Sequence, residues 1–236
     1  MGKVYLVGAG PGVDDLITLR GARVLGMADV VLYDALIEPV MLDLARPQAI
    51  RIAVGKRHGQ AGVDQADINE MIVDAGRQYP VVVRLKGGDP MLYARADEEM
   101  RALEAAGLPF EIVPGITTAL AGAAAIRRSL TLRGVARSVC FSTASRATGS
   151  APGMPSLDAD SHVVYMGRER ASDIARQFLQ AGRAPDTPVV VVESCSTRQQ
   201  RILESTLHEI SMGAAASWFA PSQPSLLMIG EAFGKR

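Results

Sequence analysis

The feature that most constrains the fold is a regular alternation of short apolar segments with longer amphipathic ones, which fills the first half of the chain. Runs rich in β-branched residues predict strands, and apolar residues at helical spacing predict the helices between them. This alternation is typical of a mostly parallel sheet with helices on both faces. The predicted strands are residues 4–8, 30–33, 51–54, 81–85 and 110–113, and the predicted helices are residues 15–28, 39–45, 64–78 and 97–106.

The second half of the chain does not continue this regular alternation of strands and helices. It opens on a helix of small residues at 117–126, and a loop rich in Ala, Gly, Ser and Pro follows at 144–155. The pattern of elements changes after residue 117. We therefore place a domain boundary near residue 114 and expect two α/β domains, residues 1–114 and residues 115–236. The remaining predicted elements are strands at 138–143, 162–166, 189–193, 201–205 and 226–229 and a helix at 171–181.

Composition excludes several classes of protein. Hydrophobic residues make up 48% of the chain, enough to bury a sizeable core. The 25 basic residues balance the 25 acidic ones, so no charge excess points to a nucleic-acid partner. No apolar run approaches the roughly 20 residues that span a bilayer, and we expect no signal peptide at the N-terminus. We therefore expect a soluble, cytoplasmic protein with no nucleic-acid or membrane partner.

The first candidate site is the glycine-rich turn Gly8–Gly12, directly after the first predicted strand. A dinucleotide-binding turn would need Gly-x-Gly-x-x-Gly, but here the third glycine comes one residue early. Pro11 also removes a backbone donor from the turn. We therefore expect a tight turn beside another kind of ligand, or a turn with a purely structural role.

The second and third candidates also follow predicted strands. Gly87 and Gly88 come after strand 81–85, at the kind of carboxyl edge where open α/β sheets bind ligands. Asp89 could accept hydrogen bonds from a ligand, or could form an Asx turn before proline. Thr117 and Thr118 follow strand 110–113 and could either cap the next helix or face a ligand.

Other kinds of site have no support in the sequence. His58, His162 and His208 are scattered, and each suits the surface or the core better than catalysis. Cys140 and Cys195 form neither a metal-ligand cluster nor a disulfide framework. We expect no bound metal, no Ser-His-Asp triad and no Walker loop.

These motifs resemble one known family along nearly the whole chain, the uroporphyrinogen-III C-methyltransferases among the tetrapyrrole methylases. The opening turn and the GGDP segment are shared by all tetrapyrrole methylases. The LYDALI and VGKRHG segments are more particular to the uroporphyrinogen enzymes. The resemblance is carried by VYLVGAGPG, LITLRGARVLGMADVVLYDALI, VGKRHG, VVVRLKGGDP, PFEIVPGITTA, VVYMG, DTPVVVVES and PSLLMIGEAF.

The resemblance implies a two-domain α/β fold, with a mostly parallel sheet in residues 1–114 and a mixed sheet in residues 115–236. It also implies a homodimer, and S-adenosyl-L-methionine bound in a cleft between the domains and released as S-adenosyl-L-homocysteine. The substrate implied is uroporphyrinogen III, methylated twice to precorrin-2. By position, the cofactor site would comprise Pro11, Gly87, Gly88, Asp89, Thr117, Thr118, Met166, Ser194, Leu226 and Met228.

The implied chemistry assigns roles to two further residues. A carbon of the reduced pyrrole attacks the sulfonium methyl in line, so the protein mainly positions two carbons and excludes water. Arg95 matches a family arginine that contacts substrate, and Glu98 matches a glutamate that could orient it; both are predicted to be catalytic. A guanidinium stays protonated in proteins, so we expect Arg95 to hold a substrate carboxylate rather than to act as a base. Glu98 could equally be a solvated residue of a helix's first turn.

The sequence departs from the family pattern on the substrate side. Where the family has Phe-Gly-Arg-Gly-Gly-Glu, this chain replaces all three glycines, and an expected Gly-His pair is also absent. These changes leave two alternatives open: a methylase acting on a later precorrin, and a non-catalytic cofactor or tetrapyrrole binder. The replaced positions are Ala94, Ala96, Asp97, Ala144 and Ser145, with Arg146 as a candidate substitute for the histidine.

Overall fold

The computed structural model describes residues 2–55, 64–145 and 157–235. His58, Arg146 and most of the VGKRHG segment lie outside these residues. The described chain divides into two compact units, Met1–Thr118 and Ala119–Arg236, called unit 1 and unit 2 below. Among the described residues, no helix has the length and apolar character needed to cross a membrane.

Unit 1 is built on a five-stranded parallel sheet with the strand order β3-β2-β4-β1-β5. Strand β1 lies between β4 and β5, and the connections that leave the neighbouring strands β1 and β4 run toward opposite edges of the sheet, to β2 and to β5. The all-parallel arrangement confirms the prediction for the first half of the chain. The strands are β1 (Lys3–Gly8), β2 (Val30–Tyr33), β3 (Ile50–Ala53), β4 (Val81–Lys86) and β5 (Phe110–Val113).

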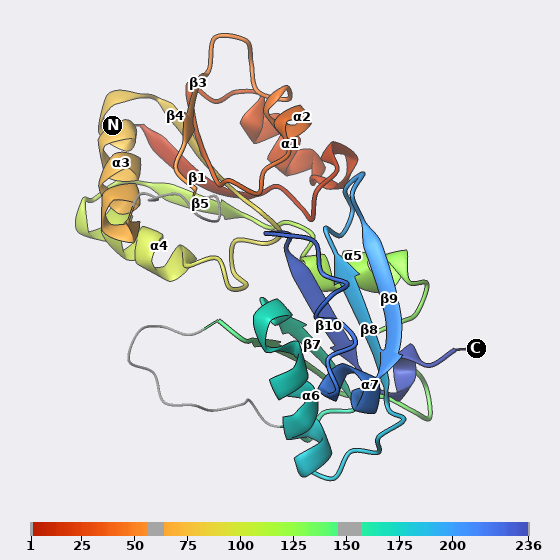
Figure 1. The fold of residues 1–236 in the computed structure, drawn as a ribbon. Helices are drawn as coiled ribbons and strands as arrows, with labels where there is room; N and C mark the ends of the chain where they lie inside the picture. Colours follow the sequence, from red (N-terminus) through yellow and green to blue (C-terminus); the bar gives the residue numbers. More distant parts are fainter. Residues whose placement is uncertain (1, 56–63, 146–156, 236) are drawn as a thin grey trace. The chain divides into compact units, whose positions relative to one another are not determined.

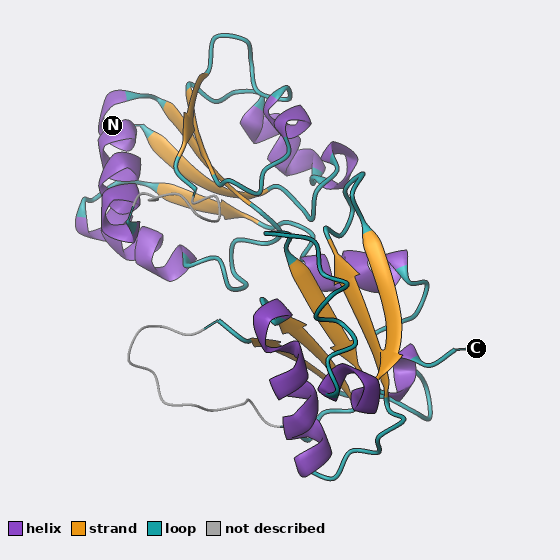
Figure 2. Ribbon diagram, in the orientation of Figure 1, coloured by secondary structure: helices purple, strands orange, loops and turns teal. Residues whose placement is uncertain are grey.

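Helices cover both faces of this sheet, as Figures 1 and 2 show. On one face, Val24 and Met41 of α1 and α2 pack against Val7 and Val83 of the strands. On the other face, the buried residues of α3 and α4 pack against Val4, Leu32 and Val82. Successive residues of a strand therefore pack into two separate hydrophobic cores, one on each face of the sheet. The helices are α1 (Leu19–Leu25), α2 (Pro39–Leu42), α3 (Gln65–Gln78) and α4 (Ala96–Ala105).

The predicted continuous helix at 15–28 was wrong. A short 3₁₀ turn, Asp14–Leu16, is followed by the extended residue Ile17, and α1 begins only after Thr18. The Thr18 hydroxyl accepts a hydrogen bond from the Gly21 N–H at 3.0 Å, which caps the helix. The apolar periodicity predicted a longer helix, but the hydrogen bond of the cap sets the first residue of α1 at Leu19.

Unit 2 contains a mixed five-stranded sheet with the order β6-β7-β10-β8-β9, which confirms the prediction for the second half. Strands β6 and β7 are parallel, while β10 runs antiparallel to both β7 and β8. Strand β9 pairs antiparallel with β8 at the far edge. The strands are β6 (Val139–Thr143), β7 (Ser161–Tyr165), β8 (Pro188–Glu193), β9 (Arg201–Thr206) and β10 (Ser225–Ile229).

Helices also cover both faces of this second sheet (Figure 2). Helix α5 (Thr118–Ala125) packs against Leu226 and Met228, and its small residues permit the approach: a Cβ placed on Gly122 would lie 3.5 Å from the Met228 sulfur. Helix α6 (Ala171–Gln180) packs on the other face with α7 (Leu207–Ser211), which the sequence analysis did not predict.

The division between the units falls after Thr118, four residues later than the predicted boundary at residue 114. The reason is local: residues 115–118 pack against strand ends of unit 1. A Cβ placed on Gly115 would lie 2.3 Å from the Gly88 carbonyl oxygen and 2.8 Å from the Gly8 Cα. The segment therefore belongs to the carboxyl edge of the first sheet.

His162 lies in the interior of unit 2 on β7, and only 2% of it is exposed. Its Nε2 lies 2.8 Å from the Ala159 carbonyl oxygen, and its ring meets the Phe178 ring edge-on at 4.8 Å between centroids. Burial lowers the pKa of His162 below its ordinary 6.5. The structure thus gives His162 a packing role, as the sequence analysis expected.

This lowered pKa predicts a loss of stability in mild acid. As pH falls below about 6.5, the unfolded chain takes up a proton at this position before the folded chain does, so folding weakens. The slope approaches about 1.4 kcal/mol per pH unit. Thermal unfolding between about pH 7.5 and about pH 5.5, followed by the fluorescence of Trp218, measures it.

The matched control is His208→Gln, which changes an exposed histidine of the same unit. His162→Gln should flatten the dependence on pH, and His208→Gln should keep it. Asp160 does not interfere, because hydrogen bonds from Ser138 and from the backbone of Arg137 lower its pKa to about 2. Equal slopes in wild type and His162→Gln would contradict the assignment.

Candidate active site

Two glycine-rich turns meet at the carboxyl edge of the unit 1 sheet, where β1 and β4 lie side by side. The Gly88 N–H donates to the Gly10 carbonyl oxygen at 2.7 Å, and the Gly10 N–H donates back to Gly88 at 3.2 Å. Both residues have left-handed backbone, with φ of 80° and 68°. The two turns singled out from the sequence therefore form one structure, at the kind of strand-order reversal where open α/β sheets bind ligands.

The third turn, at residues 114–118 after β5, packs against the first two turns. A Cβ on Gly8 would lie 2.6 Å from the Gly115 Cα and 2.7 Å from the Gly88 carbonyl oxygen. These neighbours are backbone atoms, which cannot rotate away as a side chain can. Glycine at positions 8 and 115 is therefore required for the three turns to come together.

Asp89 joins the second turn to the third. Its Oδ1 accepts a hydrogen bond from the Met91 N–H at 2.8 Å, and its Oδ2 accepts one from the Gly115 N–H at 2.9 Å. The first bond is the Asx turn that the sequence analysis considered. The second is a link that the sequence did not predict. Asp89 thus positions the turns, and its predicted contact with a cofactor stays a prediction.

Gly87 is the member of this group that faces open space. It is exposed, and no atom lies within 4 Å of the position that a Cβ would occupy. Thr117 and Thr118 are half-buried beside the same turn: a Cβ on Gly88 would lie 3.8 Å from the Thr118 hydroxyl oxygen. Thr118 is the first residue of α5. The structure therefore brings together Pro11, Gly87, Gly88, Asp89, Thr117 and Thr118.

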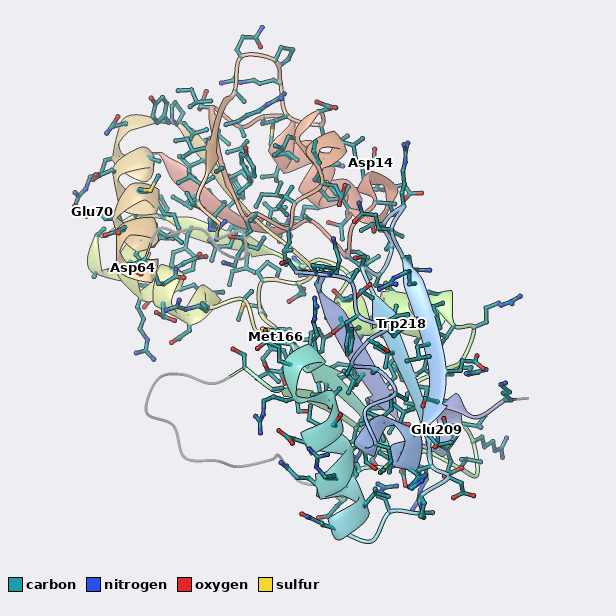
Figure 3. All side chains as sticks on the ribbon, in the orientation of Figure 1. Asp14, Asp64, Glu70, Met166, Glu209 and Trp218 are labelled. Carbon is teal, nitrogen blue, oxygen red and sulfur yellow. The ribbon has the colours of Figure 1, made fainter. Side chains whose placement is uncertain are left out.

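Unit 2 presents its own predicted residues at one edge of its sheet. Met166 and Ser194 directly follow β7 and β8, whose carboxyl ends flank the start of β10. Both have left-handed backbone, with φ of 54° and 48°, which is rare for residues with a side chain. Met166 is 51% exposed and is labelled in Figure 3. Strained backbone of this kind is frequent at ligand sites, which supports a ligand site at this edge of the unit 2 sheet.

Hydrogen bonds hold Ser194 in this conformation. Its hydroxyl donates to the Gln223 side-chain oxygen at 2.7 Å, and its carbonyl oxygen accepts from the Thr197 hydroxyl at 2.8 Å. Leu226 and Met228 differ, because they are 3% and 0% exposed and their side chains pack in the core beneath α5. Leu226 and Met228 could therefore contact a ligand only through their main-chain atoms.

Arg95 and Glu98 form a two-pronged ion pair at the start of α4. The Arg95 Nε donates to Glu98 Oε1 at 2.7 Å, and its Nη2 donates to Oε2 at 2.8 Å. The pairing raises the pKa of Arg95 and lowers the pKa of Glu98. Arg95 therefore stays charged, which suits binding of a carboxylate and does not suit proton removal.

The residues that replace the family glycines do not themselves strain the backbone near Arg95. Positive φ occurs at Tyr93 and Arg95 but not at Ala94, Ala96 or Asp97, so the replacements need no left-handed conformation. Asp97 forms an exposed pair with Arg101 at 2.9 Å. Ser145, at the position of the family histidine, is exposed, and its N–H donates to the Thr143 hydroxyl at 3.1 Å.

A buried ionic cluster lies beside these turns, and it was not predicted from the sequence. Arg84 and Lys86 of β4 are each 2% exposed, and Glu99 of α4 is fully buried. Glu99 Oε1 accepts from Lys86 Nζ at 2.8 Å and from Arg84 Nε at 3.0 Å, while Arg84 also pairs with Asp34 after β2. Burial lowers the pKa of Lys86, with Arg84 adding to the effect. The available signal was two cationic residues within an otherwise apolar strand.

Comparison with known proteins identifies the family to which this fold and these turns belong. The sequence profile of the tetrapyrrole (corrin/porphyrin) methylases matches residues 3–211. The chain belongs to the tetrapyrrole methylase family. Siroheme synthase 1 from Cronobacter sakazakii is 43% identical over 233 residues, which cover 98% of this chain and 49% of that protein. The chain thus spans about half the length of the curated relatives it matches.

Solved structures of this methylase family show the same fold. Uroporphyrin-III C-methyl transferase from Thermus thermophilus, complexed with S-adenyl homocysteine, has a TM-score of 0.85 and 38% identity, covering 98% of this chain and 93% of that one. A cobalt precorrin-4 methyltransferase has a TM-score of 0.86 and 28% identity, covering 99% and 96%. The tetrapyrrole methylase architecture therefore extends over essentially the whole chain.

Proposed function

We propose that this chain is an S-adenosylmethionine-dependent methyltransferase that converts uroporphyrinogen III to precorrin-2 by two methyl transfers. The product serves siroheme and cobalamin-type tetrapyrrole biosynthesis. One observation carries the proposal: the relation, along nearly the whole chain, to a uroporphyrin-III C-methyl transferase solved with S-adenyl homocysteine. Similarity to siroheme synthases supports the same substrate.

The residues present fit S-adenosylmethionine. The turn at Gly87 offers open space beside a backbone bridge that fixes Gly88 against Gly10. When bound, the cofactor supplies a methyl group already activated by the sulfonium, so the proposed reaction calls for no metal. The proposed binding residues come from each unit: Pro11, Gly87, Gly88, Asp89, Thr117 and Thr118, and Met166, Ser194, Leu226 and Met228.

The proposed role of the chain is to bind and orient the reactants. Arg95, held by Glu98, presents its guanidinium to a carboxylate of the substrate, which carries several. Its raised pKa keeps this charge at all working pH values, so Arg95 orients the ring without taking its proton. Asp89 contributes by holding the glycine turns together.

The direct test mixes the purified chain with uroporphyrinogen III and methyl-labelled S-adenosylmethionine under anaerobic conditions. We expect label in a singly methylated intermediate and then in precorrin-2, resolved by chromatography and mass spectrometry. Absence of methylated product from an enzyme that binds the cofactor would refute the proposed substrate.

A second candidate is methylation of a later precorrin. Two observations favour it: the similarity to a cobalt precorrin-4 methyltransferase, and the altered residues around Arg95 and Ser145. The same assay with a later precorrin in place of uroporphyrinogen III separates the two. If neither is methylated while the cofactor still binds, the chain is a non-catalytic binder.

A substitution at Gly87 tests the location of the cofactor site. Gly87→Leu should leave the unfolding midpoint unchanged, because no neighbouring atom meets the new side chain near its Cβ. It should weaken S-adenosylmethionine binding about tenfold or more, measured by calorimetry, because the side chain fills the proposed ligand space. Glu104→Leu, at an exposed residue of α4, controls for a general effect of adding an apolar side chain. Unchanged affinity in Gly87→Leu would remove this turn from the site.

The family resemblance also supports a homodimer acting in the cytoplasm, which we include in the proposal. Light scattering coupled to size-exclusion chromatography measures the oligomeric state. A monomeric mass at working concentration would contradict the dimer.

A further inference from the structure

Glu99 is a carboxylate buried in the interior of unit 1. Its Oε1 accepts hydrogen bonds from Lys86 and Arg84, and its Oε2 is buried without a hydrogen-bond partner among the described residues. A buried ion pair of this kind adds little net stability, since desolvation offsets the attraction. Its value lies in the direction of its bonds, which fix the relative placement of the elements that carry them.

The two elements that Glu99 joins carry the proposed cofactor turn and the proposed substrate-binding residue. Lys86 is the last residue of β4 and directly precedes Gly87, in the turn assigned to the cofactor. Glu99 follows Glu98 on α4, and Glu98 holds Arg95, the residue assigned to the substrate. One carboxylate therefore connects the cofactor turn to the helix turn that presents Arg95.

Besides the bonds of Glu99 to β4, the start of α4 is held by the buried residue Ala96 and by the Gln65 side-chain amide, which donates to Glu99 Oε1 at 3.5 Å. Arg95 occupies the position before the helix with left-handed backbone, and no side chain caps the helix there. The buried apolar side chain of α4 in the neighbouring core is Leu103, two turns further along. The bonds of Glu99 to Arg84 and Lys86 thus give the first turn of α4, next to Arg95, a directional link to β4.

We infer that Glu99 is a positioning residue, which sets where α4 presents Arg95 relative to the glycine turn that follows Lys86. Arg84 also links Glu99 to the end of β2, because its guanidinium bonds both Glu99 and Asp34, the residue that follows β2. The inference rests on the proposed function for the roles of the two sides, but the connection between them rests on the contacts alone.

The test is Glu99→Gln, which keeps the size of the side chain and one oxygen acceptor but removes the charge. We expect kcat to fall about tenfold or more, because alignment of the reactants depends on α4, while calorimetric affinity for S-adenosylmethionine stays within about twofold. The alkaline limb of the kcat profile should shift to lower pH, because Glu99 no longer supports the charge of Lys86. Glu104→Gln, at an exposed glutamate of the same helix, should match wild type.

A double variant separates positioning from stability. In Lys86→Met with Glu99→Gln, no cation of this pair is left unpaired, so the unfolding midpoint should recover toward that of wild type. If kcat stays low in this stable variant, the positioning role is supported. If kcat recovers together with the midpoint, Glu99 only stabilises the fold, and the inference fails.

Hydrogen exchange gives a readout that needs no turnover. Amides of residues 96–99 should exchange faster in the double variant than in wild type or in Glu104→Gln. Unchanged exchange at these amides would overturn the inference even if the chain acts on a different substrate. Inactivity of the wild type toward uroporphyrinogen III, with faster exchange in the variant, would instead overturn the proposed function alone.

Discussion

Gly115→Ala is expected to force apart the three glycine turns of unit 1 and to remove most methyl transfer. The new Cβ would lie 2.3 Å from the Gly88 carbonyl oxygen and 2.8 Å from the Gly8 Cα, so main chain must move. Movement at this point also breaks the hydrogen bond from the Gly115 N–H to Asp89. Overpacking of this kind costs about 1–3 kcal/mol of unfolding free energy. A displacement of about 1 Å in a site lowers turnover on the order of 100-fold.

Gly87→Ala is the matched control for stability. It adds the same methyl group to a glycine in the neighbouring turn, but no atom lies within 4 Å of the new Cβ. Urea unfolding followed by circular dichroism should therefore show a lower midpoint for Gly115→Ala and a wild-type midpoint for Gly87→Ala. If Gly115→Ala unfolds at the wild-type midpoint and methylates at the wild-type rate, the close approach of the three turns is not required for the site.

Much of unit 1 could be predicted because its interior follows simple rules. The short β-branched run of β2 is buried on both faces, so its boundaries are marked by the polar residues and turns that flank it. The convergence of the glycine turns also followed from the sequence, since carboxyl ends of parallel strands share one edge. The start of α1 was missed because one hydroxyl, that of Thr18, decides where the helix begins.

Other parts of the site depend on contacts between distant residues. The link from Asp89 to Gly115 joins positions 26 apart in the chain, and no local pattern marks it. The left-handed backbone at Met166 and Ser194 is equally hidden, because neither residue type signals it as glycine would. Periodicity reports which face of an element is buried, but it does not report which polar groups meet there.

Arg84→Met is expected to destabilise unit 1 strongly, which tests the ionic cluster most directly. Arg84 is 2% exposed and holds both Glu99 and Asp34, so its removal leaves two carboxylates facing a single remaining cation, Lys86. Burial opposes the charge of Arg84, yet Asp34 and Glu99 raise its pKa above the ordinary value, which shows how strongly the site favours a cation. Breaking a buried pair in this way costs about 3–5 kcal/mol.

Arg101→Met removes an arginine from an exposed ion pair in the same unit and should cost at most about 1 kcal/mol. Urea unfolding followed by circular dichroism reports on the whole chain, whereas the fluorescence of Trp218, the one tryptophan in the sequence, reports on unit 2. Arg84→Met should therefore shift the dichroism transition to lower urea and leave the fluorescence transition near that of wild type. A midpoint equal to that of Arg101→Met would show that the cluster is hydrated enough to tolerate an unpaired charge. In that case the directional bonds of Glu99 could not place α4 against β4.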